Sequence, residues 1–171
     1  MELTFRKTET GDLDRVMELF GKASATMALL GIDQWQDGYP NRELIEEDIA
    51  EGRSYVVANG GKIIGTTVLL TGGEPDYEKI YDGKWLTDGK GYLTIHRITV
   101  DPESRGTGAA SAIFAYAEKV ARENGLGSVR VDTHRGNIPM RRSLEKNGFT
   151  HCGSIYLRAN GRHRVAYEKV L

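Results

Sequence analysis

The chain has 171 residues, the length of one globular domain, and 39% of them are hydrophobic, so we expect a single folded domain over residues 1–171. Its 23 Lys and Arg residues nearly balance 24 Asp and Glu residues, which argues against a nucleic-acid or membrane-surface partner. A single cysteine excludes an internal disulfide bond, and no apolar stretch reaches the roughly 20 residues of a membrane helix, so we expect a cytoplasmic protein.

Hydrophobic periodicity predicts the secondary-structure elements in chain order. Apolar and polar residues alternate where a strand has one buried face, and apolar residues recur at steps of three and four where a helix does. Glycine-containing pairs mark the turns, as at Asn59-Gly60 and Asn160-Gly161. The predicted elements are a strand at 2–8, helices at 16–30 and about 41–51, strands at 54–58, 62–70 and 92–100, a helix from 109 to about 124, a strand at 128–133, a helix from 138 to about 147, and strands at about 150–157 and 163–170.

A polar stretch from Gly72 to Gly91 interrupts this pattern. It contains Tyr77, Tyr81 and Trp85 without clear periodicity, and it is too aromatic for a simple solvent loop, so we expect a long functional or packing loop. A strand–helix–strand unit forms the second half of the chain. This order of elements predicts an α/β fold with a mixed central sheet of about seven strands and helices on both faces.

The most informative stretch follows the strand at 92–100. Arg105-Gly106-Thr107-Gly108 forms a turn and Ala109-Ala110 begins a helix, so small residues let a ligand approach the backbone of the first helical turn. Unpaired N–H groups and the positive end of the helix dipole favour a phosphate group there. The alternative is a glycine turn that only lets the helix pack closely against the sheet. A bare Gly-x-Gly pattern would favour that alternative.

The surrounding residues make the pattern more specific, because nearly the whole chain resembles the GNAT superfamily of acetyl-CoA-dependent N-acetyltransferases. The family's pyrophosphate loop has Arg or Gln, two residues, Gly, one residue, and then Gly or Ala, and Arg105, Gly108 and Ala110 match it in order. The strand His96-Arg97-Ile98-Thr99-Val100 resembles the family's fourth strand, and the stretch from Asn137 to Phe149 resembles its second cofactor-side helix and Gly-Phe ending.

The resemblance implies the GNAT acyl-CoA N-acyltransferase fold and a site for acetyl-CoA as co-substrate, without a metal ion. The Ile98 N–H would polarise the thioester carbonyl. Asn137 would hydrogen-bond the pantetheine arm, and its alternative role is a plain helix N-cap; both can hold. The residues that would bind the cofactor through their backbone are Ile98, Thr99 and Val100 for the arm, and Arg105, Gly106, Thr107, Gly108, Ala109 and Ala110 for the pyrophosphate.

The implied reaction is direct attack of an amine on the acetyl thioester, which needs a base for the amine's proton and an acid for the departing thiolate. His96 is the first candidate base, because some arylalkylamine acetyltransferases carry histidine at the matching position; the alternative is a hydrogen-bonded strand histidine. Many family members have a tyrosine acid where this chain has Leu144, so the acid stays open. Tyr156 is a candidate acid, with core packing as its alternative.

A primary amine of a small molecule or a peptide is expected to bind near the first two helices and the long loop. Residues 33–40 combine Trp35 and Tyr39 with carboxylates, as a pocket for a cationic amine would. The alternative is a loop whose Trp35 closes the edge of the core. The identity of the amine and the formation of a homodimer stay open.

Two other functions remain as alternatives. A non-catalytic acyl-CoA-binding sensor on the same fold would not need the tyrosine that Leu144 replaces. A dinucleotide-binding oxidoreductase would also use a strand, Gly106-x-Gly108 and a helix, but Ser111 stands where Gly or Ala is expected. A metal site is not expected, because the four histidines lack HxxxH or HExxH spacing. His151 and Cys152 are adjacent on a predicted strand and would point to opposite faces, which excludes a dyad between them.

Overall fold

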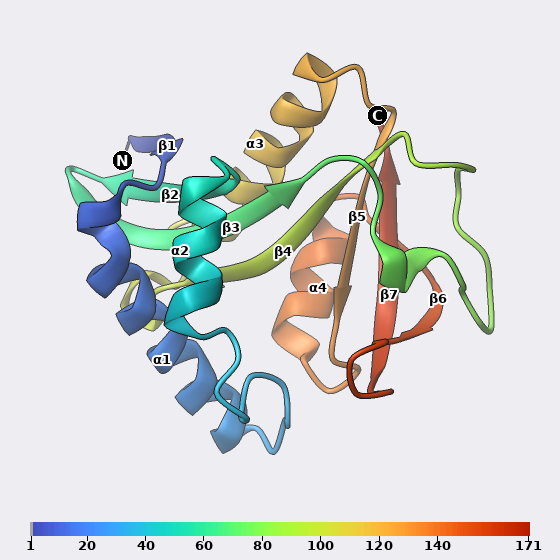
Figure 1. Cartoon of the computed structure of the whole chain (residues 1–171), viewed down its shortest axis with the longest axis horizontal. Coiled ribbons are helices and arrows are strands. Elements are labelled where there is room, and N and C mark those ends of the chain that lie inside the picture. Colours follow the sequence, from blue (N-terminus) through green and yellow to red (C-terminus); the bar gives the residue numbers. More distant parts are fainter. Residues whose placement is uncertain (1) are drawn as a thin grey trace. The chain divides into compact units, whose positions relative to one another are not determined.

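The computed structural model describes residues 2–171, which contain four α-helices and seven strands in the predicted order (Figure 1). The strands form one sheet in the order β1-β2-β3-β4-β5-β7-β6. The pair β4–β5 is parallel, whereas β1–β2, β2–β3, β5–β7 and β6–β7 are antiparallel, so the prediction of a mixed sheet is confirmed. The elements are β1 (Leu3–Lys7), α1 (Leu13–Leu29), α2 (Arg42–Ala50), β2 (Ser54–Asn59), β3 (Lys62–Leu70), β4 (Tyr92–Val100), α3 (Ala109–Glu123), β5 (Ser128–Thr133), α4 (Ile138–Lys146), β6 (Thr150–Tyr156) and β7 (His163–Val170).

These elements group into two compact units that divide β4 and α3 between them. The first unit contains the residues up to Leu69 together with His96–Tyr116, and the second contains Leu70–Ile95 and Ala117–Leu171. The expectation of one domain over residues 1–171 stays a prediction.

In the first unit, helices cover both faces of the strands. Successive residues of a strand point to opposite faces. Val56 and Ile63 accordingly pack in a cluster with the apolar stripe of α1, whereas their neighbours Val57 and Ile64 pack with Ile113 of α3. Figure 1 shows α1 and α2 side by side on one face of β2 and β3, with α3 on the other. The prediction of helices on both faces is therefore confirmed.

In the second unit, the long loop between β3 and β4 packs onto the sheet. Tyr77 is 2% exposed, and the Trp85 Nε1–H donates a hydrogen bond of 2.9 Å to its carbonyl. Further along the loop, Tyr81 pairs with Ser154 of β6 through two backbone hydrogen bonds of 2.8 Å each. The rings of Tyr77 and Trp85 therefore serve packing, whereas Tyr81 is 47% exposed. Among the described residues, no helix is both long and apolar enough to cross a membrane.

Candidate functional site

The second half of β4 departs from regular strand geometry at Arg97, whose φ is +49°. This left-handed conformation costs a residue with a Cβ roughly 1–2 kcal/mol. In the described chain, Trp35 and Asp82 also combine a side chain with positive φ, but both lie outside strands. β4 pairs in register with β5 from Tyr92 to Ile95. The left-handed residue Arg97, which we call the break of β4, lies two residues after that pairing. A break of this kind redirects the neighbouring peptide groups.

The loop that follows β4 presents its backbone to solvent. Gly106 and Gly108 are exposed with φ of +77° and +80°, and no atom lies within 4 Å of the place where a Cβ would stand on either residue. The Ala112 N–H of α3 donates to the Gly108 carbonyl at 2.9 Å, so the loop runs directly into the hydrogen-bond ladder of the helix, and the first N–H groups of an α-helix point out of that end. Open space in front of a helix N-terminus is a geometry that binds phosphate groups.

Asp101 fixes the start of this loop. Its side chain is fully buried and accepts hydrogen bonds from Arg15 Nη2 at 2.7 Å and from the Glu103 N–H at 3.0 Å. Its own N–H donates to the Ile64 carbonyl at 2.7 Å. Burial alone would raise the pKa of Asp101, but these hydrogen bonds and the ammonium of Lys22 outweigh it, so the pKa lies below its ordinary value. At neutral pH the ionised side chain of Asp101 thus holds the loop to α1, and its backbone N–H holds the loop to β3.

The other predicted residues of β4 lie in the same unit as the loop. Ile98 and Val100 pack beside α3, and Thr99 is 7% exposed. His96 is half-buried, and its carbonyl accepts a hydrogen bond of 3.4 Å from Thr67 Oγ1. The first unit therefore brings together the candidate base, the candidate oxyanion donor and the predicted pyrophosphate loop.

The two predicted acceptor residues lie in different environments. Trp35 is 9% exposed and packs its ring edge-on against Phe20 at 5.5 Å between centroids, so it closes the edge of the core, as the alternative interpretation expects. Tyr39 is 41% exposed, and its hydroxyl accepts a hydrogen bond of 2.8 Å from Arg97 Nη1. Tyr39 therefore reaches β4, whereas Trp35 belongs to the core around α1.

Asn137, Leu144 and Tyr156 lie in the second unit. The Asn137 Oδ1 accepts a hydrogen bond of 3.3 Å from the Met140 N–H, which confirms its role as the N-cap of α4. The side chain of Leu144 is fully buried in the core. Tyr156 is 46% exposed at the end of β6, where its ring meets that of His163 edge-on at 5.5 Å.

The remaining histidines and the cysteine have structural surroundings. His134 Nδ1 accepts a hydrogen bond of 2.9 Å from the Gly136 N–H in the turn after β5. Burial lowers the pKa of His163, as do the nearby cations. His151 is exposed whereas Cys152 is buried, but the register of β6 against β7 shifts between His151 and Gly153, so the expectation that the two side chains point to opposite faces stays a prediction. Among the described residues, no three His, Cys, Asp or Glu side chains are placed to hold a metal ion.

Asp48 lies beside the candidate site, and the sequence analysis did not predict it. This residue of α2 is fully buried and accepts hydrogen bonds of 2.9 Å from both Nε and Nη2 of Arg97, and one of 2.7 Å from Arg53 Nε. Burial alone would lower the pKa of Arg97, but Tyr39 and Asp48 raise it above its ordinary value. A signal existed, because Asp48 stands three residues after Ile45, in phase with the inward face of the helix.

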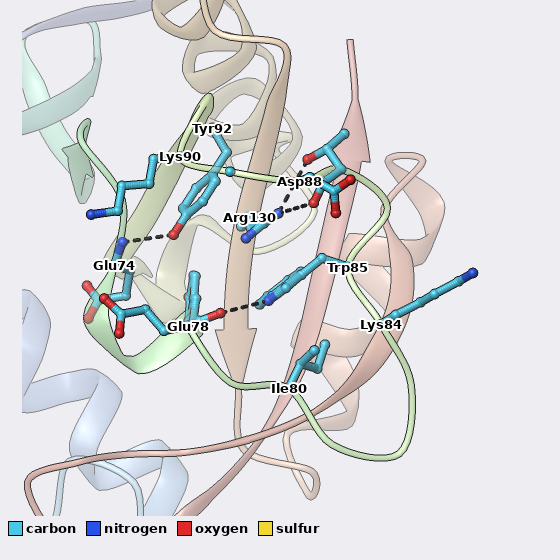
Figure 2. A pocket seen from close by; sticks show the side chains of 12 residues that line it. Glu74, Glu78, Ile80, Lys84, Trp85, Asp88, Lys90, Tyr92 and Arg130 are labelled. Carbon is cyan, nitrogen blue, oxygen red and sulfur yellow. Dashed lines mark hydrogen bonds between the residues drawn. The ribbon is translucent and has the colours of Figure 1, made fainter.

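A separate hollow of about 440 Å³ lies in the second unit beneath the long loop (Figure 2). Its lining carries charges of both signs, and its most buried cation, Arg130, is already stacked between Trp85 and Tyr92 and paired with Glu168. None of the predicted site residues lines it. We therefore place the candidate site on β4 and the loop before α3.

Known proteins resemble this chain in sequence and in fold. The model of the acetyltransferase (GNAT) family matches residues 15–149. Streptothricin acetyltransferase of Streptomyces lavendulae is 25% identical over 160 residues, which cover 87% of this chain and 82% of that protein.

Two solved structures extend the comparison to the fold. A GNAT-family acetyltransferase of Streptococcus agalactiae superposes with a TM-score of 0.85 at 36% identity, over 99% of this chain and 95% of that one. The PaiA N-acetyltransferase of Thermoplasma acidophilum, solved in complex with coenzyme A, superposes with a TM-score of 0.72 at 18% identity over 100% of both chains. The predicted fold class is thereby confirmed, and the chain belongs to the acetyltransferase (GNAT) family.

Proposed function

We propose that the protein transfers the acetyl group of acetyl-CoA to a primary amine of a small molecule or a peptide, by direct attack in a ternary complex. The observation that carries this proposal lies within the first unit. There, the break of β4 at Arg97 is followed by an open, glycine-containing loop at the N-terminus of α3. A strand with redirected peptide groups can pair with an extended pantetheine arm, and the loop can bind the pyrophosphate.

The cofactor would contact mainly the backbone. The peptide groups of Ile98, Thr99 and Val100 would pair with the pantetheine arm, and the amides of residues 105–110 would bind the pyrophosphate. The Thermoplasma acidophilum protein was solved with coenzyme A, which supports this choice of cofactor for the fold.

The chemistry requires one proton to leave the amine and one to reach the sulfur. His96 would take the proton from the ammonium, because only the neutral amine can attack the carbonyl carbon. The Ile98 N–H would stabilise the oxyanion while the C–N bond forms and the C–S bond breaks. The thiolate would then accept a proton from water or from an acid of the protein. The buried, apolar Leu144 has no proton to give.

A binding experiment tests the cofactor assignment. Coenzyme A and acetyl-CoA should raise the melting temperature of the protein, whereas NADH and ATP should not, because they lack the pantetheine arm. Gly108→Glu should abolish the shift, since its carboxylate would occupy the pyrophosphate position. Gly125→Glu is the matched control: Gly125 also has positive φ and open space, but it lies at the other end of α3. Equal shifts with NADH would contradict the proposal.

A second experiment separates the enzyme from a sensor. The absence of the family's tyrosine at Leu144 is the observation that favours a non-catalytic acyl-CoA-binding protein. A panel of amines should include amine-bearing antibiotics, because one relative is named a streptothricin acetyltransferase. Acetylated product with one of these amines supports the enzyme. Tight coenzyme A binding without any product across the panel favours the sensor.

A further inference from the structure

We propose that Arg97 is a positioning residue for acyl transfer, held by Asp48 and Tyr39 so that its backbone stays left-handed and fixes the break in β4. This inference rests on the proposed function, because the peptide group that Arg97 would orient carries the Ile98 N–H assigned there to the thioester carbonyl. Arg97 itself would touch neither the cofactor nor the amine.

The backbone of Arg97 adopts a strained conformation for which arginine is poorly suited. A φ of +49° is easy for glycine and accessible to asparagine or aspartate, but it brings the Cβ of an arginine too close to its own backbone. Nothing in the backbone of a strand compensates for this strain. The compensation therefore has to come from the side chain of Arg97.

That side chain is fixed at three points within the first unit. Its Nε donates to Asp48 Oδ2 at 2.9 Å and its Nη2 donates to Asp48 Oδ1 at 2.9 Å, which is the bidentate geometry that sets the plane of a guanidinium. Its Nη1 donates to the hydroxyl of Tyr39 at 2.8 Å. The Arg97 side chain is 9% exposed and Asp48 is fully buried, so water competes little for these bonds.

The anchor is itself rigid, because Asp48 is held from a second side. Arg53 Nε donates to Asp48 Oδ1 at 2.7 Å, and the Arg53 N–H donates to the Asp48 carbonyl at 3.0 Å. Two guanidinium groups thus face one buried carboxylate. A fixed anchor on α2 and a fixed guanidinium leave the backbone of Arg97 little freedom to return to ordinary strand geometry.

This restraint acts on one peptide group in particular. The peptide bond between Arg97 and Ile98 carries the Ile98 N–H, and its direction follows from the dihedral angles of Arg97. If Arg97 relaxed to an extended conformation, that N–H would point elsewhere. Asp48 would therefore influence acyl transfer through the backbone of Arg97, without contact to the reactants.

A pair of substitutions separates the backbone role from the loss of the side chain. Arg97→Gly and Arg97→Ala both remove the guanidinium and leave Asp48 to Arg53, but only glycine adopts positive φ without strain. We expect Arg97→Gly to retain a kcat about tenfold higher than Arg97→Ala, and to unfold at a higher urea concentration. A merely structural arginine would give the two variants equal kcat, although the strain at positive φ would still make Arg97→Ala the less stable of the two. Equal values, or a better Arg97→Ala variant, would overturn the inference.

A double-mutant cycle then tests the route from Asp48. Asp48→Asn in the otherwise unchanged protein should lower kcat more than it changes the KM for acetyl-CoA. In the Arg97→Gly background the same substitution should lower kcat no further, while it still lowers stability because Asp48 also binds Arg53. Additive losses of kcat would show that Asp48 acts by another route and would overturn the inference.

The outcome for the unmodified protein distinguishes this inference from the proposed function. Calorimetric titration with coenzyme A needs no amine and is measured first. If the protein neither binds coenzyme A nor transfers an acetyl group, both proposals are wrong. If the protein does both, and the kcat of Arg97→Gly is no higher than that of Arg97→Ala, only the positioning role is wrong.

Discussion

Arg97 of β4 and Arg130 of β5 are both buried arginines paired with fully buried carboxylates, but their backbones differ. The side chains are 9% and 3% exposed, and their partners, Asp48 and Glu168, have no exposed side-chain surface. Arg97 is left-handed, whereas Arg130 lies in a regular strand that pairs in register with both neighbours. The same pair of charged groups therefore accompanies strain in one case and regular structure in the other.

The surroundings of Arg130 show what its pair accomplishes. Its guanidinium lies 3.9 Å from the ring centroid of Tyr92 and 4.2 Å from that of Trp85, and it donates to the Thr87 carbonyl at 2.6 Å. Glu168 accepts hydrogen bonds from the Leu86 N–H at 2.7 Å and from Ser128 Oγ at 2.6 Å. The pair thus fastens the long loop to the sheet of the second unit.

A buried ion pair by itself therefore does not reveal its role; the backbone of the arginine does. Arg97 holds a conformation that a strand would not adopt unaided, so changes around it should alter turnover. Arg130 lies in a strand with regular backbone geometry and holds the long loop against that strand. Changes around it should therefore alter stability.

The largest effect is expected for Arg130→Met, which keeps the apolar bulk between the two rings but leaves the charge of Glu168 buried without a cation. Removing one partner of a buried pair costs about 3–5 kcal/mol, and we expect the free energy of unfolding in urea to fall by that amount. Lys119→Met is the control, because Lys119 is 67% exposed and its loss should change stability by less than about 0.5 kcal/mol. A loss below about 1 kcal/mol for Arg130→Met would contradict the role of this pair.

His96→Ala should show the opposite signature, with a small loss of stability and a large loss of turnover. If His96 accepts the amine's proton, the acetylation rate should fall on the order of 10²-fold and should rise with pH as the amine deprotonates without help. The rate between pH 6 and about 10 measures this, with His134→Ala as the control histidine. An unchanged rate and pH profile would make His96 structural and would leave catalysis to cofactor positioning and the Ile98 amide.

Asp101→Asn tests a third buried carboxylate, the one that holds the loop before α3. Hydrogen bonds to a charged group contribute about 1.5–3 kcal/mol, so we expect a loss of that size in urea at neutral pH, together with weaker coenzyme A binding.

The pH dependence of that loss has a definite sign. Because the pKa of Asp101 is lowered in the folded state, the unfolded state takes up the proton first, and the contribution is present above about pH 4 and is lost as pH falls through the folded pKa. The difference between the two proteins should therefore shrink in acid. A difference that stays constant down to about pH 2 would show that the charge of Asp101 is unimportant.

The smallest effect is expected for Tyr39→Phe, which removes one of the three bonds that hold Arg97. The hydroxyl group lies on an exposed ring, so its loss should lower kcat less than about fivefold and stability by less than about 1 kcal/mol. Steady-state kinetics with a fixed amine measures both kcat and KM. A larger loss than that of Asp48→Asn would place Tyr39 in contact with the amine and would change our view of how Arg97 is held.

The local elements could be predicted because their signals lie in neighbouring residues. The predicted bounds of β4 and β5 match the structure, and Asn137 caps α4 as its sequence context indicates. Trp35 shows the limit of this reasoning, since an aromatic residue beside carboxylates fits both a binding pocket and a core edge. Its packing against Phe20 depends on how the segment after α1 folds back, which composition does not encode.

The order of strands and helices, the glycine loop before α3 and the family could all be predicted from the sequence, because hydrophobic period, turn residues and motif spacing are local properties. Two features appear only in the folded chain: Asp48 and Arg97, 49 residues apart, share two hydrogen bonds, and Arg97 is left-handed within a strand-forming sequence. Strand propensity around Arg97 favours an extended backbone. A buried partner on another element can outweigh that preference, and such a partner exists only once α2 has packed against the sheet.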